Sequence, residues 1–475
     1  HVEIVPDPLV EISWADYDPW TLLIPSPSLR RVPGGNYRLD AELTATLADL
    51  IASRWAHVML TQGRDNIGPA SDLAWAEHEL ALWLRHELDP SALPSEFVAS
   101  LVEVYGPDFG ASLVRAIRYH DRLIPALQSL ADVPVADLPV SWNSYLAHRL
   151  QAETRLVAEG YVTEAGLLFR DLGAMQGSEP VLDFPVEQRA QPDSMVVTGV
   201  QPVRGGVLAG VRFEQADSSP GEMVTVEPFR LTSEGWAHTR MTADFWGAEY
   251  EDRSEHFELH YYELDASTVE GLLPYLESVH AYLAKVLALP PDQSAPDSLS
   301  DTTPFLVFVS PYTQEAFLSS QPPVVIEAHA AVLRVPSPYG IALPADGTMQ
   351  SYAQASAAWE LVKALITRQV SPVPADNQVT VAFMGWAMAQ IGVEYAALPS
   401  PAQEMLADSL ATQVLLDLLV ELYGPDAIPL LLENLVGSSS VDEWLARSLG
   451  IEDTGAVRKA WQECLADNPL CPLDY

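Results

Sequence analysis

The segment HFELH places two histidines and a glutamate at alternate positions, His256, Glu258 and His260. Alternate side chains of a β-strand point to one face of its sheet, so a strand would bring the three together. Imidazole and carboxylate groups are common ligands of transition metals. The spacing therefore allows a metal site, with a half-buried structural strand as the alternative. Two further histidines, in GWAHTRM and IEAHAAVL, have no partner that the sequence identifies.

A second polar pair, Glu360 and Lys363, stands in the apolar segment AAWELVKALITRQV at 357–370. Three residues apart on a helix, the two side chains can form a modest salt bridge. The chain contains no Gly-x-Ser-x-Gly elbow, no phosphate-binding Gly-rich loop ending in Gly-Lys, and no dinucleotide fingerprint. A carboxylate pair for glycoside hydrolysis stays open, because so many acids create many pairs.

The helices that carry these residues belong to a repeat. LVEVYGPD at 101–108 recurs as LVELYGPD at 419–426, with seven identities in eight positions. Both copies read as the end of an apolar helix followed by a Gly-Pro-Asp stop. Trp142 lies 34 residues beyond the first Gly-Pro-Asp, and Trp461 lies 35 beyond the second. The sequence therefore predicts two copies of one helical unit, at about 40–148 and 350–466.

The middle of the chain has a different pattern. An amphipathic helix is expected at 144–172, followed by three segments that alternate apolar and polar residues, as half-buried antiparallel strands do. This predicts a small α+β module at 144–250. Beyond it we expect a strand containing HFELH, a long helix ending near 289 and a buried strand at PFLVFVS.

The order of strand, long helix, strand, hairpin and two helices over 255–466 resembles the gluzincin (thermolysin-like, peptidase MA-like) zinc peptidases, and 38–148 resembles a shortened copy. The module at 144–250 is similar to the nuclear-transport-factor-two-like cone of helices over a curved sheet. In the gluzincins one helix carries His-Glu-x-x-His, whose histidines bind Zn²⁺ and whose glutamate activates water, and a second helix adds a glutamate ligand. The resemblance implies that HFELH is the first strand of a peptidase-like sheet rather than a metal site.

Carried onto the C-terminal copy, the resemblance implies an incomplete site. The two histidine positions fall on Trp359 and Lys363, the general-base position on Glu360, and the third-ligand position on Met384. Trp and Met cannot replace imidazole and carboxylate, and an ammonium group repels the ion. Without a metal, Glu360 has no activated water to deprotonate.

In the N-terminal copy the histidine positions fall on Ser53 and His57, with Arg54 where the base would be, and the third-ligand position falls on His78. The interval from the last motif residue to the third ligand is 21 residues in both copies, which supports the alignment. His57, His78 and Glu77, with Glu79 beside them, form the metal candidate of this copy. The alternative is that these polar residues are solvated and that Trp55, Trp75, Leu80 and Trp83 pack a core.

The amino-acid composition excludes some classes of binding partner. The chain of 475 residues has 65 acidic and 25 basic side chains, a net charge of −40, so a nucleic-acid partner is excluded. No calcium-loop motif accompanies the acids, which indicates a solubilising surface.

No apolar run reaches the roughly 20 residues of a membrane span. The start of the chain carries no leader pattern and is read as mature or processed. Cys464 and Cys471 could close a short disulfide loop, which favours an extracytoplasmic protein.

These observations together predict a multidomain α+β protein: an extended arm at 1–37, a truncated gluzincin-like unit at 38–143, the cone-like module at 144–250 and a degenerate peptidase domain at 251–475. We expect no cofactor and no catalysis, and a structural, adhesive or binding role at the cell surface or outside the cell. The partner would be a second copy, in a self-assembling layer, or a protein or glycan. Two alternatives stay open: a metal-dependent hydrolase using His57 and His78, and a small-ligand-binding protein using the 144–250 module.

Overall fold

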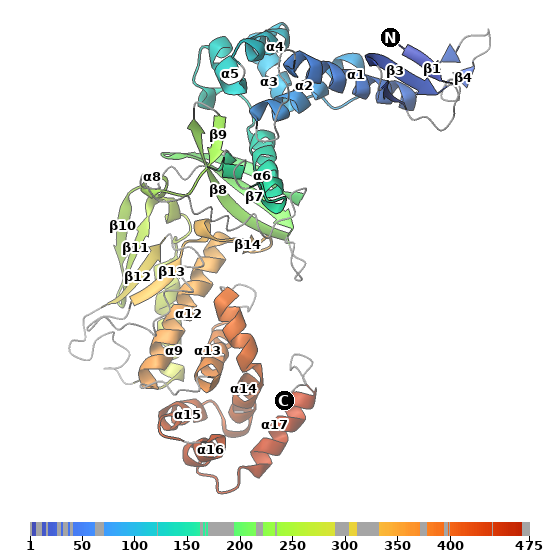
Figure 1. The fold of residues 1–475 in the computed structure, drawn as a ribbon. Coiled ribbons are helices and arrows are strands. Elements are labelled where there is room, and N and C mark those ends of the chain that lie inside the picture. Colours follow the sequence, from blue (N-terminus) through green and yellow to red (C-terminus); the bar gives the residue numbers. More distant parts are fainter. Residues whose placement is uncertain are drawn as a thin grey trace. The chain divides into compact units, whose positions relative to one another are not determined.

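The computed structural model describes residues 2–5, 12–15, 18–25, 30–31, 37–38, 41–61, 71–120, 122–161, 165–166, 168–169, 194–214, 222–232, 235–289, 304–310, 332–370, 378–393, 398, 400–438 and 440–467. The chain divides into two compact units, unit 1 (His1–Pro220 and Glu227–Arg240) and unit 2 (Gly221–Val226 and Met241–Tyr475). Both combine helices with sheets, which confirms the predicted α+β multidomain class (Figure 1). No helix in the described ranges is long and apolar enough to cross a membrane.

Unit 1 starts with short strands. β3 pairs in parallel with β1 and antiparallel with β2, and β4 pairs with β5. This small sheet packs on the first helix through a cluster that includes Leu22, Ile24 and Leu47. The strands are β1 Val2–Val5, β2 Ser13–Ala15, β3 Asp18–Pro25, β4 Arg30–Arg31 and β5 Tyr37–Arg38.

In the described ranges six α-helices follow, of which the first two form an antiparallel pair. Apolar side chains at helical spacing give each of them a buried face. Side-chain oxygens of Ser71 and Ser95 cap the second and third helices. The helices are α1 Ala41–Thr61, α2 Asp72–Leu88, α3 Glu96–Tyr105, α4 Phe109–His120, α5 Leu123–Ala131 and α6 Asn143–Ala158.

α6 covers a sheet made by β6, β7, the part of β8 from Glu227 onward, and β9. The strands are β6 Val196–Val203, β7 Gly206–Glu214, β8 Glu222–Thr232 and β9 Gly235–His238. The helix predicted for 144–172 is too long, because α6 ends at Ala158 and Gly160 then adopts a φ of +83°. A residue in that left-handed region ends the helix.

Unit 2 contains a sheet in the order β10-β11-β12-β13, antiparallel between β10 and β11 and parallel elsewhere. The predicted boundary at residue 250 falls within β10. α9 and α12 cover one face of the sheet, where Phe257, Phe305 and Val335 are fully buried. The elements are α8 Ala243–Trp246, β10 Glu249–Arg253, β11 Phe257–Tyr262, α9 Leu272–Val286, β12 Phe305–Ser310, β13 Val332–Pro336 and β14 Leu343–Pro344.

Six helices end unit 2: α12 Met349–Gln369, α13 Gln378–Gln390, α14 Ser400–Tyr423, α15 Ala427–Leu435, α16 Val441–Leu449 and α17 Gly455–Asp467. Their order parallels α1 to α6, and α1 and α12 each have 21 residues. The two YGPD corners also agree: α3 ends at Tyr105 and α14 at Tyr423, each followed by a glycine with φ of +95° or +82°. These similarities support the predicted repeat.

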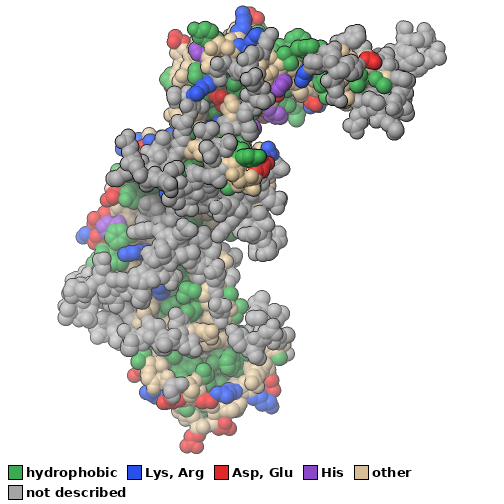
Figure 2. All heavy atoms as spheres, viewed as in Figure 1, with side chains coloured by type: hydrophobic (Ala, Val, Ile, Leu, Met, Phe, Trp, Pro, Cys, Tyr) green, Lys and Arg blue, Asp and Glu red, His purple; other side chains and the backbone are tan. Residues whose placement is uncertain are grey.

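The surface view in Figure 2 shows acidic side chains scattered among hydrophobic and basic ones on the described part of α15 to α17. The chain's three lysines, Lys285, Lys363 and Lys459, all lie in unit 2. Cys464 lies in α17 and has no disulfide partner among the described residues. Cys471 is outside the described residues, so the predicted disulfide stays a prediction.

Candidate functional site

The positions that the resemblance assigns to a zinc centre lie on α12 and α13, inside the core of unit 2. Trp359 is 3 % exposed and Met384 5 % exposed. Every residue from Thr380 to Met388 is buried. The carboxylate of Glu360 accepts hydrogen bonds from Lys363 Nζ at 3.2 and 3.4 Å. Large apolar groups and an internal ion pair therefore occupy the place where a metal would need ligands.

The N-terminal positions lie on the surface of unit 1. Ser53, His57 and His78 are exposed, and the guanidinium of Arg54 lies 5.9 Å from the ring centre of Trp14. His57 Nδ1 lies 3.1 Å from Glu77 Oε1, so α1 and α2 bring these two candidates together.

His78 does not join them in a three-ligand group. Across the described ranges, Glu251, Glu258 and His260 form the one set of three potential ligands within 4.8 Å of one another. Glu79, next to His78, is buried and accepts a hydrogen bond from Ser95 Oγ at 2.6 Å. Trp75 and Leu80 pack in the core as the alternative expected, but Trp55 is 49 % exposed.

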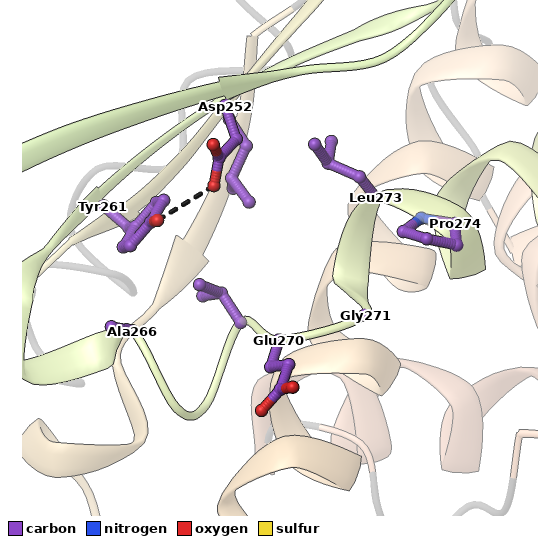
Figure 3. Close-up of a pocket in the computed structure, with 9 residues that line it drawn as sticks. Asp252, Tyr261, Ala266, Glu270, Gly271, Leu273 and Pro274 are labelled. Carbon is purple, nitrogen blue, oxygen red and sulfur yellow. Dashed lines mark hydrogen bonds between the residues drawn. The ribbon is translucent and has the colours of Figure 1, made fainter.

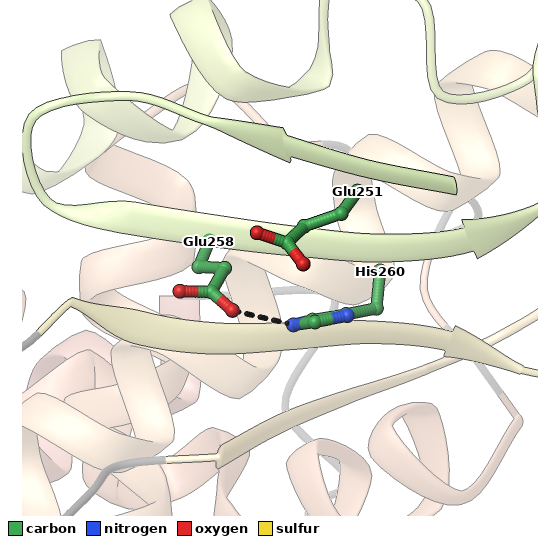
Figure 4. Close-up of side chains that lie close together, drawn as sticks. All are labelled: Glu251, Glu258 and His260. Atoms are coloured by element: carbon green, nitrogen blue, oxygen red, sulfur yellow. Dashed lines mark hydrogen bonds and ion pairs between the residues drawn. The ribbon is translucent and has the colours of Figure 1, made fainter. Parts of the chain in front are cut away.

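Two of the three potential metal ligands in the HFELH segment contact each other. His260 Nε2 lies 2.9 Å from Glu258 Oε1 on β11. His256, just before the strand, bonds instead to Glu277 of α9 at 2.7 Å. Glu251 of β10, the cross-strand neighbour of His260, is the third potential ligand of the cluster (Figure 4).

A cation already occupies this cluster, the guanidinium of Arg253. It lies 2.8 Å from Glu251 and 3.0 Å from Glu258. A metal ion would compete with it, since the guanidinium already neutralises the two carboxylates that would be ligands. The cluster is therefore an ion-pair network that could bind a metal only in competition with Arg253.

A pocket of about 350 Å³ lies on the other face of the same two strands, at the start of α9 (Figure 3). Asp252 accepts a hydrogen bond from the Tyr261 hydroxyl at 2.9 Å at its edge. Burial, followed by Asp252, raises the pKa of Tyr261. Leu259, Val269 and Leu273 give the pocket an apolar lining, and Glu270 adds a second carboxylate. Such a lining suits a neutral or positively charged small molecule better than an anion.

A buried polar cluster in unit 1 was not predicted. His238 of β9 lies between two carboxylates: its Nδ1 is 3.1 Å from Glu153 Oε2 on α6, and its Nε2 is 3.0 Å from Glu227 Oε2 on β8. Their exposed fractions are 4 %, 0 % and 8 % for His238, Glu153 and Glu227. The rings of Phe169 and Phe229 lie 5.1 and 5.2 Å from the imidazole. We call this cluster the buried triad.

Further polar groups line the inner face of α6. Arg149, one turn before Glu153, is buried. Burial raises the pKa of Asp72, and the backbone N–H of Leu123 and the charge of Arg149 oppose that shift. Asp72 in turn accepts the backbone N–H of Leu123 at 3.0 Å. Burial lowers the pKa of His148 to about 4, with Arg149 and His78 adding to the shift.

The sequence carries a faint signal for the buried triad. Glu153 shares the apolar-periodic face of its helix with Leu146, Leu150 and Arg149. A glutamate and an arginine on such a face indicate buried charge that needs partners. The partners themselves could not be found, because Glu153 and His238 are 85 positions apart.

Comparisons with models of protein families, with curated protein sequences and with solved structures find no match to this chain. The resemblances to gluzincins and to nuclear-transport-factor-two-like proteins gain no support from them. Both therefore stay predictions that rest on motif spacing and element order.

Proposed function

We propose that this chain is a non-catalytic protein with a peptidase-like architecture, acting as a structural, adhesive or binding protein at the cell surface. The observation that supports it most is the burial of Trp359 and Met384 in the core at two of the expected ligand positions. Burying a large apolar side chain contributes about 1.5–3 kcal/mol. Packing of these two side chains thus stabilises the fold at a place where a zinc peptidase would bind its ion.

The general-base position fits this proposal. Glu360 could act on water only if the water were activated by a metal. Its carboxylate instead lies against Lys363 in the same helix, one turn away. A lysine ammonium at that distance repels a divalent cation, so the pair supports a structural role for both residues.

The proposed place and partners rest on composition. A net charge of −40 keeps such a chain soluble and repels polyanions. The partner would be a protein, a glycan or a second copy. Size-exclusion chromatography over a range of protein concentrations tests whether the chain self-assembles. Elution as a monomer at every concentration would exclude self-assembly.

Restoring the ligands tests the central proposal. The purified chain should contain no stoichiometric zinc and should not cleave unfolded peptides. The variant Trp359→His, Lys363→His, Met384→Glu should bind about one zinc per chain, because the resemblance assigns these three positions to the ligands of one zinc ion. Variants with only two of the three changes serve as matched controls and should bind zinc far more weakly. Zinc-dependent peptide cleavage by the unmodified chain would overturn the proposal.

The hydrolase alternative rests on the contact between His57 and Glu77. Two ligands hold a catalytic metal poorly, since zinc enzymes use three protein ligands and a water. The small-ligand alternative was placed in the 144–250 module. The pocket described above lies elsewhere, at residues 252–274 of unit 2.

A further inference from the structure

We propose that the pocket at the start of α9 is a binding site for a small organic cation, an ammonium group attached to an apolar body. This inference goes beyond the proposed function, because it involves neither the expected zinc positions nor self-assembly. Its failure would leave both of those unaffected.

The charges at the pocket favour a cation. Among the residues that line it, Asp252 and Glu270 are acidic and none is basic. Asp252 forms no ion pair with a basic side chain in the described part of the chain, whereas the acids on the opposite face of the same strands are paired with Arg253. An ammonium ion would therefore meet a carboxylate whose charge is not compensated, and an anion would be repelled by two of them.

Tyr261 orients the Asp252 carboxylate and adds a second acceptor. Its hydroxyl donates to Asp252 Oδ2 at 2.9 Å, so Oδ1 and the hydroxyl oxygen can accept from a donor in the pocket (Figure 3). Burial, and after it Asp252, raises the pKa of Tyr261, so the hydroxyl keeps its proton at neutral pH. The ring of Tyr250 stacks on that of Tyr261, with centres 5.8 Å apart. Aromatic rings attract a nearby cation, which adds to the attraction of the carboxylate.

The apolar part of the lining fits the body of such a ligand. Leu259 on β11 and Val269 before α9 are 1 % and 5 % exposed, and Leu273 continues this surface on the helix. The volume of about 350 Å³ lies at the lower end of ordinary small-molecule sites. We therefore expect a ligand of about ten non-hydrogen atoms, with its charge at the Asp252 edge and its apolar part against these side chains.

The loop that closes the pocket is held in place by the protein itself. The backbone N–H of Val269 donates to the Asp265 carbonyl at 3.0 Å, and Gln350 Nε2 of α12 donates to the Glu270 carbonyl at 2.7 Å. Gly271 then begins α9 in a left-handed conformation, with a φ of +78°. A pocket formed without its ligand reduces the entropy lost on binding.

The start of α9 does not reverse this preference for a cation. A helix N-terminus favours anions through its unpaired N–H groups and a partial charge of about +0.5. Here the N–H of Leu272 already donates to the Val269 carbonyl at 2.9 Å, and Pro274 has no N–H. The full charges of Asp252 and Glu270 exceed the partial charge of the helix.

Titration of the full chain with 2-phenylethylammonium, followed by calorimetry, tests the site. Salt at about 150 mM screens the overall negative charge of the chain. We expect a Kd of about 1 mM or below. The matched anion 3-phenylpropionate and the neutral 2-phenylethanol should bind at least about tenfold more weakly, because neither can pair its polar group with the carboxylate.

Two variants separate the site from the general acidity of the chain. Asp252→Asn keeps an acceptor for Tyr261 and should weaken binding of 2-phenylethylammonium about tenfold. Glu251→Gln removes the same charge from the next residue of β10, whose side chain lies on the other face of the sheet. This matched control should keep the affinity within about twofold of the wild type.

A third variant adds a competing cation. Ala266 lines the pocket from an exposed position, so the ammonium group of Ala266→Lys can reach the site and should weaken binding at least about tenfold. Three results would overturn the proposal: no binding of 2-phenylethylammonium up to about 10 mM, equal affinity in wild type and Asp252→Asn, or equal affinity for 3-phenylpropionate. If Asp252→Asn does not fold, Ala266→Lys and the comparison of the three probes still decide.

Discussion

Lys363 and Glu360 form an ion pair one turn apart on α12, with Nζ 3.2 Å from Oε1. The side chain of Glu360 is 9 % exposed and that of Lys363 is 23 % exposed. Burial raises the pKa of Glu360, and Lys363 opposes that shift. The lysine therefore favours the charged form of a carboxyl group that its surroundings disfavour.

Replacing Lys363 by Met should leave that carboxylate without its partner. We expect a loss of about 2 kcal/mol in the free energy of unfolding at pH 7.5, since breaking a buried pair costs more than the pair contributes. The loss should shrink at pH 5, where the unpaired carboxyl group takes up a proton. Urea unfolding measures both. The double variant Glu360→Gln, Lys363→Met is the control and should lie within about 1 kcal/mol of the wild type; equal losses in both variants would contradict this account.

Asp265 should make unit 2 less stable as pH rises. It is fully buried, and burial raises its pKa from 3.8 to about 6, although Ser337 Oγ donates to Oδ1 at 2.6 Å. Its Oδ2 has no hydrogen-bond partner in the described part of the chain. Because the folded pKa is raised, stability is complete below about pH 4 and falls as pH rises through about 6.

Asp265→Asn should therefore stabilise the protein by about 1–2 kcal/mol at pH 8, because it removes a buried charge while keeping an acceptor for Ser337. At pH 4 the gain should vanish. Denaturant unfolding at the two pH values checks this. Asp346→Asn, at an exposed turn, should change neither value. A gain that is the same at both pH values would show that charge is not the cause.

Gly235 leaves room for a buried hydroxyl. A Cβ at Gly235 would lie 2.6 Å from Tyr145 Oη, and the glycine has a φ of +114°. Tyr145 cannot easily move, because its ring packs edge-on against Trp75 at 5.0 Å and Trp142 at 5.6 Å. We expect Gly235→Ala to cost about 3 kcal/mol or more in thermal or urea unfolding. Gly160→Ala, with a φ of +83° and open space in the described surroundings, should cost only about 1 kcal/mol.

Arg253 should compete with metal ions at the cluster on β10 and β11. Removing its guanidinium frees the carboxylates of Glu251 and Glu258 beside His260. We expect Arg253→Ala to bind Zn²⁺ at least about tenfold more tightly than the wild type in calorimetric titrations, a difference of about 1.4 kcal/mol. Adding His260→Ala should abolish the gain. Unchanged affinity in Arg253→Ala would show that the three side chains do not act as ligands.

Much of the architecture follows from sequence pattern. The apolar helix ends followed by Gly-Pro-Asp predict both YGPD corners, and alternation in HFELH predicts β11. Local signals also explain the main error in an element's length. The helix predicted to reach residue 172 stops at Ala158, since a glycine two residues later takes a left-handed conformation that the apolar pattern does not reveal.

The polar sites were harder to predict because their partners are distant in sequence. Glu360 and Lys363 lie one helical turn apart, and their contact was expected. The partner of His260 in the neighbouring strand, Glu251, depends on strand register. His238 meets Glu153 across 85 positions, a contact that only the packing of α6 on the sheet creates. A repeat or motif cannot reveal such a pairing.

The placement of the lysines has a practical consequence. Lys285 and Lys459 are exposed, and Lys459 is 78 % accessible, while Lys363 is engaged with Glu360. Reagents that react with lysine side chains, such as fluorescent labels or coupling resins, will modify lysines in unit 2 alone, because unit 1 has no lysine. The molecule can thus be immobilised through lysines of unit 2, with the buried triad in the unit that has no lysine.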